Sequence, residues 1–185
     1  MGEMGIVITV SGLHGTGKTT VARILAESLQ LRFFSAGDLF RQMAIRGELS
    51  LSEISQKASK NSDFDKLVDD RTREEAEKGN VVIEGLLSSW VAGKKANLRF
   101  YLYAPDDVRV LRIAKREHCS VEEARNATLF REDLERRRFK KFYAIDIDNH
   151  SIYDLSLNTA FLSAEGNARI LECFAREYSR GQGVK

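Results

Sequence analysis

The segment from Gly12 to Thr20 carries the clearest chemical signal in the sequence. Its spacing fits the pattern G-x-x-x-x-G-K-[ST], in which glycines let backbone N–H groups face phosphate oxygens. The lysine of this pattern reaches the β- and γ-phosphates, and the following hydroxyl can ligate Mg²⁺. An apolar run over residues 5–10 precedes the loop and a helical pattern follows it, which argues against a chance glycine-rich turn. We expect the triphosphate to contact Gly12, Leu13, His14, Gly15, Thr16, Gly17, Lys18, Thr19 and Thr20.

Two further segments place polar residues where predicted strands end. Ser35 and Arg41 flank a turn from strand to helix, and Glu84 ends the next strand. Open α/β sheets bind ligands at this edge, so Arg41 could clamp a second phosphate and Glu84 could hold Mg²⁺. A capping serine with a solvated arginine, and a capping glutamate, are the open alternatives. The candidate acceptor residues are Ser35, Gly37, Arg41, Glu84, Gly85 and Asp133, and the candidate metal ligands are Thr19 and Glu84.

Arginines recur at helical spacing in the second half of the chain. Arg109, Arg112 and Arg116 form one stripe, and Arg131 and Arg138 share a face of the next predicted helix. A charge run of this kind usually faces solvent, and residues 136–141 could also contact RNA. Phosphoryl transfer between two anions, however, requires cations around the transferred group, and a single arginine can contribute about 10³–10⁵ in rate. With the glycine loop present, we interpret these arginines as part of a lid.

The elements that must position these residues alternate along the chain. Strands are predicted at 6–11, 31–35, 81–83, 98–103 and 155–158, with helices between them. This order predicts a parallel sheet covered by helices on both faces, in a single domain over 1–185. Capping boxes at Ser50-x-x-Glu53 and Ser120-x-x-Glu123 mark two helix starts. The helical block at about 36–79 predicts a mobile acceptor-binding arm, and the helical segment at about 120–143 predicts the lid. The apolar Trp90 segment is interpreted as packing, although Ser88 and Ser89 could face the acceptor.

Composition narrows the class of protein. The 185 residues carry a formal net charge of +2, which is unlike a protein whose main partner is nucleic acid or an anionic membrane. No apolar stretch is long enough for a membrane span. Two cysteines, Cys119 and Cys173, and three scattered histidines suggest neither disulfides nor a zinc site. We therefore expect a cytoplasmic monomer that binds neither nucleic acid nor membranes.

The order of these motifs resembles the nucleoside monophosphate kinases, and most closely the archaeal-type cytidylate kinases. The likeness rests on Val-Ser-Gly-x-x-Gly-x-Gly-Lys-Thr, Phe-Ser-Ala-Gly-Asp-Leu-Phe-Arg, Val-Val-Ile-Glu-Gly, Arg-Ile-Ala-Lys-Arg-Glu and the arginine-rich Arg-Glu-Asp segment. It implies a P-loop NTPase-like three-layer α/β/α fold with five parallel strands, a helical arm that binds the nucleoside monophosphate (NMP), and a short lid. It also implies Mg²⁺- and ATP-dependent phosphorylation of CMP and dCMP, a step of pyrimidine nucleotide metabolism.

The resemblance also assigns roles by position. Lys18 matches the phosphate-loop lysine, and Ser35 and Arg41 match acceptor-phosphate residues. Donor-side arginines would be Arg112 and Arg116, and the lid arginines that act in catalysis would be Arg131 and Arg137 or Arg138. In one departure from the pattern, Leu86 stands where members usually carry arginine, so another arginine would have to replace it.

The expected reaction is in-line transfer of the ATP γ-phosphoryl group to a 5′-phosphate oxygen. That phosphate is ionised near neutral pH, with a second pKa of about 6, so no strong general base is required. The amino group of cytosine would suit an acidic residue as its hydrogen-bond acceptor. The open candidates for this residue are Asp133, Glu135, Asp63 and Asp65. Alternative acceptors are AMP, UMP or a small molecule such as shikimate, and a different class is an NTP-dependent RNA-binding or regulatory module.

Overall fold

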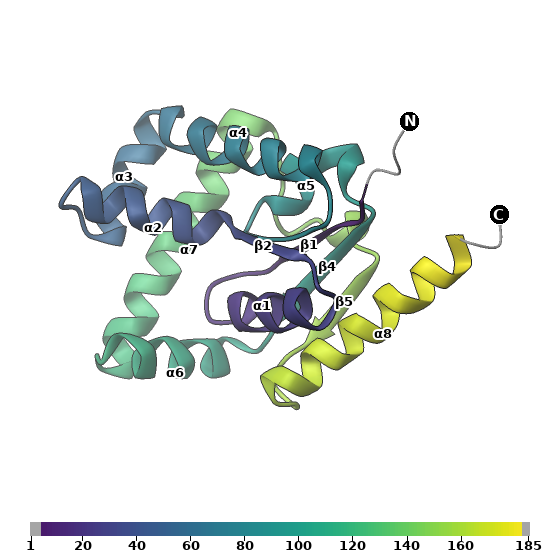
Figure 1. Cartoon of the computed structure of the whole chain (residues 1–185). Coiled ribbons are helices and arrows are strands. Elements are labelled where there is room, and N and C mark those ends of the chain that lie inside the picture. The colour runs from purple at the N-terminus through teal and green to yellow at the C-terminus, as the bar shows by residue number, and fades with distance from the viewer. Residues whose placement is uncertain (1–4, 183–185) are drawn as a thin grey trace.

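A parallel β-sheet lies between two layers of helices in the computed structural model, which describes residues 5–182 (Figure 1). The strands follow the order β2-β3-β1-β4-β5, and every neighbouring pair is parallel. They are β1 (Val7–Ser11), β2 (Arg32–Ser35), β3 (Val81–Glu84), β4 (Leu98–Tyr103) and β5 (Leu155–Asn158). This confirms the predicted three-layer α/β/α fold and its five-stranded sheet. The chain runs from β1 to one edge and later crosses to the other, so the loop after β1 lies at a topological switch point.

Eight α-helices surround the sheet within the described residues. They are α1 (Lys18–Ser28), α2 (Ala36–Arg46), α3 (Leu51–Lys60), α4 (Asp63–Lys78), α5 (Ser88–Ala92), α6 (Asp106–Glu117), α7 (Val121–Tyr143) and α8 (Ala164–Gln182). Short 3-10 helices occupy Gly93–Lys95 and His150–Ile152. Both predicted capping boxes are present, at Ser50 before α3 and at Ser120 before α7. None of the helices described is long and apolar enough to cross a bilayer.

Apolar side chains from both faces of the sheet fix the helices in place. On one face α1 and α8 pack over Ile8, Val10 and Phe100, all fully buried. On the other face α4 and α5 pack over Val81 and Ile83. These strands are therefore buried on both sides, as expected for a parallel sheet whose residues form a continuous apolar run.

Helices α2, α3 and α4 form a helical arm above the carboxyl edge of the sheet (Figure 1). The arm has its own small core around Phe40, Ile54 and Ala58. Helix α3 packs against the long helix α7, which rises from α6 on the opposite side. The arm and α7 together enclose the space above the loop that follows β1.

Candidate active site

The loop between β1 and α1 adopts a conformation that its glycines make possible. Gly12 has a φ of +152°, and a Cβ atom there would lie 2.3 Å from the Leu102 carbonyl oxygen. At Gly15, with a φ of +77°, a Cβ would lie 2.5 Å from the Arg109 carbonyl oxygen. Inside the loop, the Thr16 hydroxyl donates to the Leu13 carbonyl at 2.9 Å. The loop is thus pressed against β4 and α6, with the N-terminus of α1 directly behind it.

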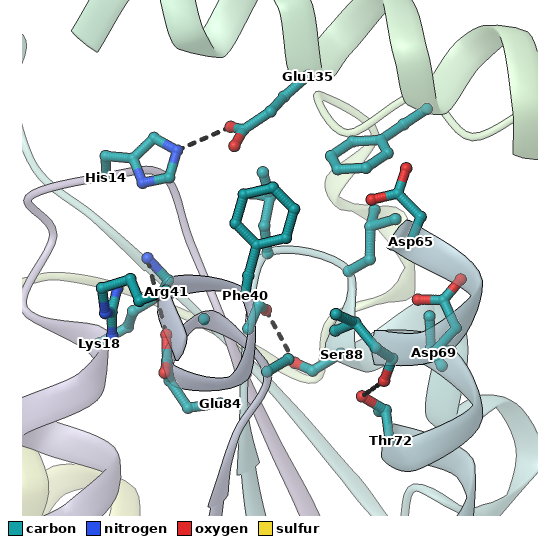
Figure 2. Close-up of a pocket in the computed structure, with 18 of the residues that line it drawn as sticks. His14, Lys18, Phe40, Arg41, Asp65, Asp69, Thr72, Glu84, Ser88 and Glu135 are labelled. Atoms are coloured by element: carbon teal, nitrogen blue, oxygen red, sulfur yellow. Dashed lines mark hydrogen bonds and ion pairs between the residues drawn. The ribbon is translucent and has the colours of Figure 1, made fainter. Parts of the chain in front are cut away.

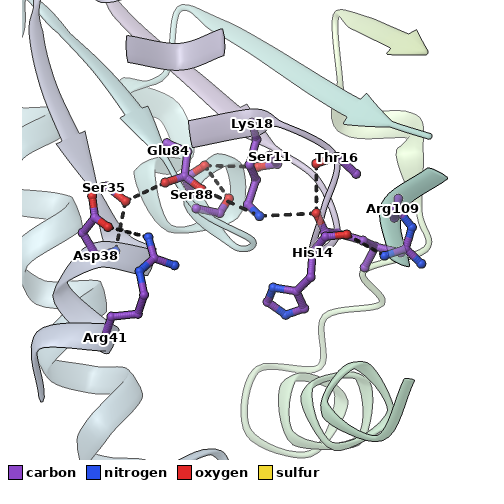
Figure 3. Close-up of polar contacts among 12 residues, drawn as sticks. Ser11, His14, Thr16, Lys18, Ser35, Asp38, Arg41, Glu84, Ser88 and Arg109 are labelled. Carbon is purple, nitrogen blue, oxygen red and sulfur yellow. Dashed lines mark hydrogen bonds and ion pairs between the residues drawn. The ribbon is translucent and has the colours of Figure 1, made fainter. Parts of the chain in front are cut away.

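Lys18, in the first turn of α1, lies beneath this loop next to a buried carboxylate (Figure 3). Its Nζ donates to the Leu13 carbonyl at 3.3 Å and lies 3.8 Å from Oε1 of Glu84. Burial lowers the pKa of Lys18, and the opposing charge of Glu84 offsets part of that effect. A buried ammonium group with one distant counter-ion is well suited to attract a phosphate.

Ser35 connects the arm to the same carboxylate. Its Oγ donates to Oε2 of Glu84 at 2.6 Å and accepts from the backbone N–H of Asp38 at 3.0 Å. Ser35 therefore caps α2, as one sequence alternative held, and also orients Glu84. Glu84 is almost completely buried and extends from the end of β3 toward Lys18.

Arg41 lies one turn after Asp38 on α2, and its guanidinium group pairs with the Asp38 carboxylate. Gly37 lies beside this arginine, and a Cβ there would make an ordinary contact with Nη1 of Arg41 at 3.5 Å. Gly85 lets β3 and α2 approach each other, since its Cβ would lie 2.8 Å from that of Ala36. Arg41 and Lys18 line the same cavity (Figure 2).

A cavity, here called the arm pocket, lies between the arm, α5 and α7 above Lys18 (Figure 2). Its walls combine apolar side chains with an unusual number of charged ones. It is lined by His14, Lys18, Ala36, Gly37, Phe40, Arg41, Asp65, Val68, Asp69, Thr72, Glu84, Gly85, Leu86, Leu87, Ser88, Val91, Arg131, Glu135, Arg138 and Phe139.

Deep in the arm pocket, Arg138 faces Asp65 with unused hydrogen-bonding capacity. Nε of Arg138 lies 3.1 Å from Oδ2 of Asp65, but the angle does not make a hydrogen bond. As a result, Oδ2 of Asp65 and both Nε and Nη1 of Arg138 are buried without a hydrogen-bond partner among the residues described. Burial raises the pKa of Asp65 to about 6 against the opposing charge of Arg138. These orphaned buried atoms have capacity to hydrogen-bond to a ligand or an ordered water.

Two further polar residues of α4 line the same pocket and were missed by sequence reasoning. Asp69 accepts a 2.5 Å hydrogen bond from the hydroxyl of Tyr143, and burial raises the pKa of its carboxyl group. The Thr72 hydroxyl donates to the Val68 carbonyl at 2.8 Å. Asp65, Asp69 and Thr72 follow an i, i+4, i+7 pattern, so the signal was a polar stripe on the face of α4 that an ordinary helix would fill with apolar residues.

A second cavity, the outer pocket, opens on the other side of the phosphate loop. Arg112 donates to the Gly15 carbonyl at 3.4 Å, to the Thr159 hydroxyl at 3.0 Å and to the Thr159 carbonyl at 2.8 Å. Thr159, which sequence reasoning also missed, in turn donates to the Thr16 carbonyl at 2.8 Å. The pocket is lined by Gly15, Thr16, Gly17, Thr20, Val21, Arg112, Ile113, Arg116, Thr159, Leu162, Ser163, Ala164 and Asn167.

The structure brings most, but not all, of the expected site residues together. Arg131 and Arg138 face the arm pocket. Arg137, in contrast, is largely exposed and pairs with Asp133 at 2.9 Å. Arg137 and Asp133 line neither the arm pocket nor the outer pocket. The two pairs differ because residues 131 and 138 share the inner face of α7, and residues 133 and 137 lie on its outer face. Of the four acidic candidates for reading a base, Asp65 and Glu135 line the arm pocket, and Asp63 binds Asn61 on the surface.

The protein supplies few ligands for a metal. Within residues 5–182 no three carboxylate, histidine or cysteine side chains gather as a metal-binding cluster. A site for Mg²⁺ does not need one, because this ion commonly takes one or two protein ligands and completes its shell with phosphates and water. Glu84 and the Thr19 hydroxyl, one residue after Lys18, fit that donor set.

The sequence and structure have clear relatives. Residues 7–160 match the model of the cytidylate kinase-like family. A protein named cytidylate kinase from Archaeoglobus fulgidus is 48% identical over 89% of this chain and 91% of its own length. Another, from Staphylothermus marinus, is 42% identical over 94% of this chain and 98% of its own.

Solved structures of more distant proteins share the fold. A shikimate kinase from Bacteroides thetaiotaomicron superposes with a TM-score of 0.62 at 18% identity, covering 92% of this chain and 98% of that one. A gluconokinase from Sinorhizobium meliloti gives a TM-score of 0.61 at 14% identity, covering 97% and 98%. At these identities the likeness concerns the fold alone.

Proposed function

The chain belongs to the cytidylate kinase-like family, and we propose from this premise that it transfers the γ-phosphoryl group of ATP to CMP or dCMP. The observation that carries the proposal is the likeness, along nearly the whole chain, to proteins named cytidylate kinase. The two pockets on either side of Lys18 support it, because a kinase must hold a donor and an acceptor with their phosphates meeting at one point.

The arm pocket offers cytosine the partners that its edge requires. Cytosine presents an amino group next to ring acceptors. Oδ2 of Asp65 would accept from the amino group, and Nε and Nη1 of Arg138 would donate to the acceptors. Uracil presents a carbonyl in place of the amino group, which would face the Asp65 carboxylate. Phe40 and Phe139 provide apolar surface for the ring.

The outer pocket would hold the nucleoside of ATP, with Arg112 and Arg116 beside it and the triphosphate passing along the loop to Lys18. Arg41 would bind the acceptor phosphate from the arm side. An acceptor oxygen then attacks the γ-phosphorus in line while the bond to the β–γ bridging oxygen breaks, leaving ADP. Lys18, Arg41 and Arg131 would neutralise the charge on the transferring group. Arg137 and Asp133 have no part in this proposal.

Glu84 and Thr19 would hold Mg²⁺ at the junction of the two sites. When bound, Mg²⁺ neutralises negative charge on the β- and γ-phosphates. Ser35 keeps Glu84 in place through its 2.6 Å hydrogen bond, and Lys18 stays close enough to balance its charge.

We further propose that the protein works as a monomer in the cytoplasm without nucleic acid. The near-neutral net charge supports the absence of a nucleic-acid partner, and the free thiols of Cys119 and Cys173 fit a reducing compartment. An RNA-dependent activity would instead weaken strongly as salt is added.

An acceptor panel tests the proposal. ADP release from Mg·ATP is measured with CMP, dCMP, UMP, AMP or shikimate, and with no acceptor. We expect CMP and dCMP to be used best and the Lys18→Ala variant to be inactive while its circular dichroism spectrum is unchanged. Equal ATP consumption without any acceptor, preference for another acceptor, or normal transfer by Lys18→Ala would refute the assignment.

A further inference from the structure

Glu135 lies at the boundary between the phosphate loop and the arm pocket, and the mechanism above gives it no role. Its side chain is almost completely buried, and each carboxylate oxygen has a different partner. Oε1 accepts from Nε of Arg131 at 3.1 Å, and Oε2 lies 2.7 Å from Nε2 of His14 (Figure 2). One carboxylate thus joins an arginine of α7 to a side chain of the phosphate loop.

In this arrangement Glu135 is ionised and the buried His14 is neutral. Burial alone would raise the pKa of Glu135, but the charge of Arg131 and the hydrogen bond from His14 outweigh it and hold that pKa below its usual range. Burial lowers the pKa of His14 more than Glu135 raises it, so Nε2 of a neutral imidazole donates to the carboxylate. Lys18 and Arg138 are the other charged groups that face this pair.

Anchoring of the loop to α7 does not explain Glu135, because Glu132 already performs it. Glu132 is buried one turn earlier, receives Arg109 at 2.6 Å and accepts from the backbone N–H of His14 at 3.3 Å. Arg109 also donates to the His14 carbonyl at 2.8 Å. Unlike Glu132 and Arg109, Glu135 and Arg131 face the arm pocket.

Arg131 is held by one nitrogen only. Its Nε binds Glu135, and among the described residues its two terminal nitrogens make no hydrogen bond. A long arginine side chain loses much rotamer freedom when it binds a ligand, so fixing it at Nε removes part of that freedom beforehand. The terminal nitrogens remain available as a fork for a phosphate between Lys18 and Arg41.

We propose that Glu135 is a positioning residue that aims the Arg131 guanidinium at the transferring phosphoryl group, with His14 of the phosphate loop fixing the carboxylate. This inference rests on the proposed function. His14 occupies a variable position of the loop motif, and the proposal gives its side chain the role of holding the Glu135 carboxylate. Because loop and arginine share one carboxylate, the phosphates and the cation that neutralises them are held in register.

The test is a double-mutant cycle in which kcat and the KM values for ATP and CMP are measured for each variant. Glu135→Gln keeps the shape of the side chain and removes its charge. We expect kcat to fall about 10- to 100-fold, the range for a misplaced catalytic group, with the KM values for ATP and CMP changed less than threefold. Arg131→Ala should be at least as slow, and adding Glu135→Gln to it should cause no further loss, because Glu135 acts only through Arg131.

Glu172→Gln is the matched control, since it removes the carboxylate of another i, i+4 pair, with Arg176 on α8, that lines neither pocket. It should behave as wild type. Unchanged kcat in Glu135→Gln, or losses that multiply in the double variant, would overturn the proposal.

Should Glu135→Gln not fold, His14→Ala carries the same test. Its loss of kcat should be smaller, and it too should disappear in the Arg131→Ala background. An equal loss in that background would overturn the proposal. A wild-type protein without CMP-dependent ADP release would instead refute the proposed function, so the two failures are distinguishable.

Discussion

Replacing Asp65 by asparagine should relax the choice between cytosine and uracil. In the wild-type arm pocket a buried carboxylate oxygen without a hydrogen-bond partner would face the amino group of cytosine. Asparagine has nearly the same shape, but it can either accept through its oxygen or donate through its nitrogen. The variant should therefore use CMP less well and tolerate UMP better, while its KM for ATP stays unchanged.

The expected size of this effect follows from the loss of one charge. A hydrogen bond to a charged group contributes about 1.5–3 kcal/mol, against about 0.5–1.5 kcal/mol for a neutral one. A difference of about 1.4 kcal/mol corresponds to a factor of about ten, so kcat/KM for CMP should fall roughly tenfold. The ratio of kcat/KM for CMP to that for UMP should fall further, because uracil gains a donor opposite its carbonyl.

The pH dependence of that ratio is a second and sharper readout. Burial raises the pKa of Asp65 to about 6, so the carboxyl group becomes protonated as the pH falls through 6 and then donates instead of accepting. The preference for CMP over UMP should thus rise with pH through about 6 and level off above it. Both acceptors carry the same phosphate, whose own titration near pH 6 cancels in the ratio.

The assay is ADP release with CMP and UMP between pH 5 and 8 at constant ionic strength. Asp70→Asn is the control, because Asp70 lies on the exposed side of α4 and pairs with Arg73. It should keep the wild-type ratio at every pH. A wild-type ratio in Asp65→Asn, or a ratio that does not change with pH in the wild type, would refute Asp65 as the reader of the base.

Three other substitutions separate the remaining parts of the site. Arg41→Ala should raise the KM for CMP at least tenfold and leave ATP binding nearly intact by titration, and a defect confined to ATP would contradict its acceptor role. Arg112→Ala should do the reverse, raising the KM for ATP several-fold because three hydrogen bonds around Thr159 and the loop are lost. Its KM for CMP should not move, and a change there instead would argue against the outer pocket as the donor site. Gly12→Ala should abolish ATP binding and lower the thermal midpoint by about 4–8 °C, for a loss of about 2 kcal/mol, because the new methyl group meets the Leu102 carbonyl. A normal midpoint and normal ATP affinity would show that the loop tolerates a side chain at residue 12.

The sequence was informative wherever a local rule determines the structure. The glycine loop, the two capping boxes and the five apolar runs each depend on residues close together in the chain, and all were found at their predicted places. Helix α5 was not predicted, because its five residues are too few for a helical period to emerge from the apolar segment around Trp90.

The inner part of the arm pocket depends on contacts between distant residues, which the spacing of residues along the sequence does not reveal. Asp65 meets Arg138 across 73 residues, and Asp69 meets Tyr143 across 74. Consecutive arginines at 137 and 138 look alike in sequence, yet one is largely exposed and the other is buried over the ring of Phe139. Which one faces the pocket depends on how α7 is rotated against the arm, and that rotation is set by packing.

The charges of the free site also determine how it must bind phosphate. Almost every cation that faces the transfer point already has a carboxylate partner: Lys18 has Glu84, Arg41 has Asp38, and Arg131 has Glu135. The pairs of Lys18 and Arg131 offset the cost of burying those two charges, whereas the pair of Arg41 is partly exposed. A phosphate therefore exchanges one anion for another, and the net gain per contact is much smaller than the attraction between the two bare charges. Affinity for either nucleotide should accordingly be modest, and the larger gain should come in the transition state, where negative charge lies between all three cations at once.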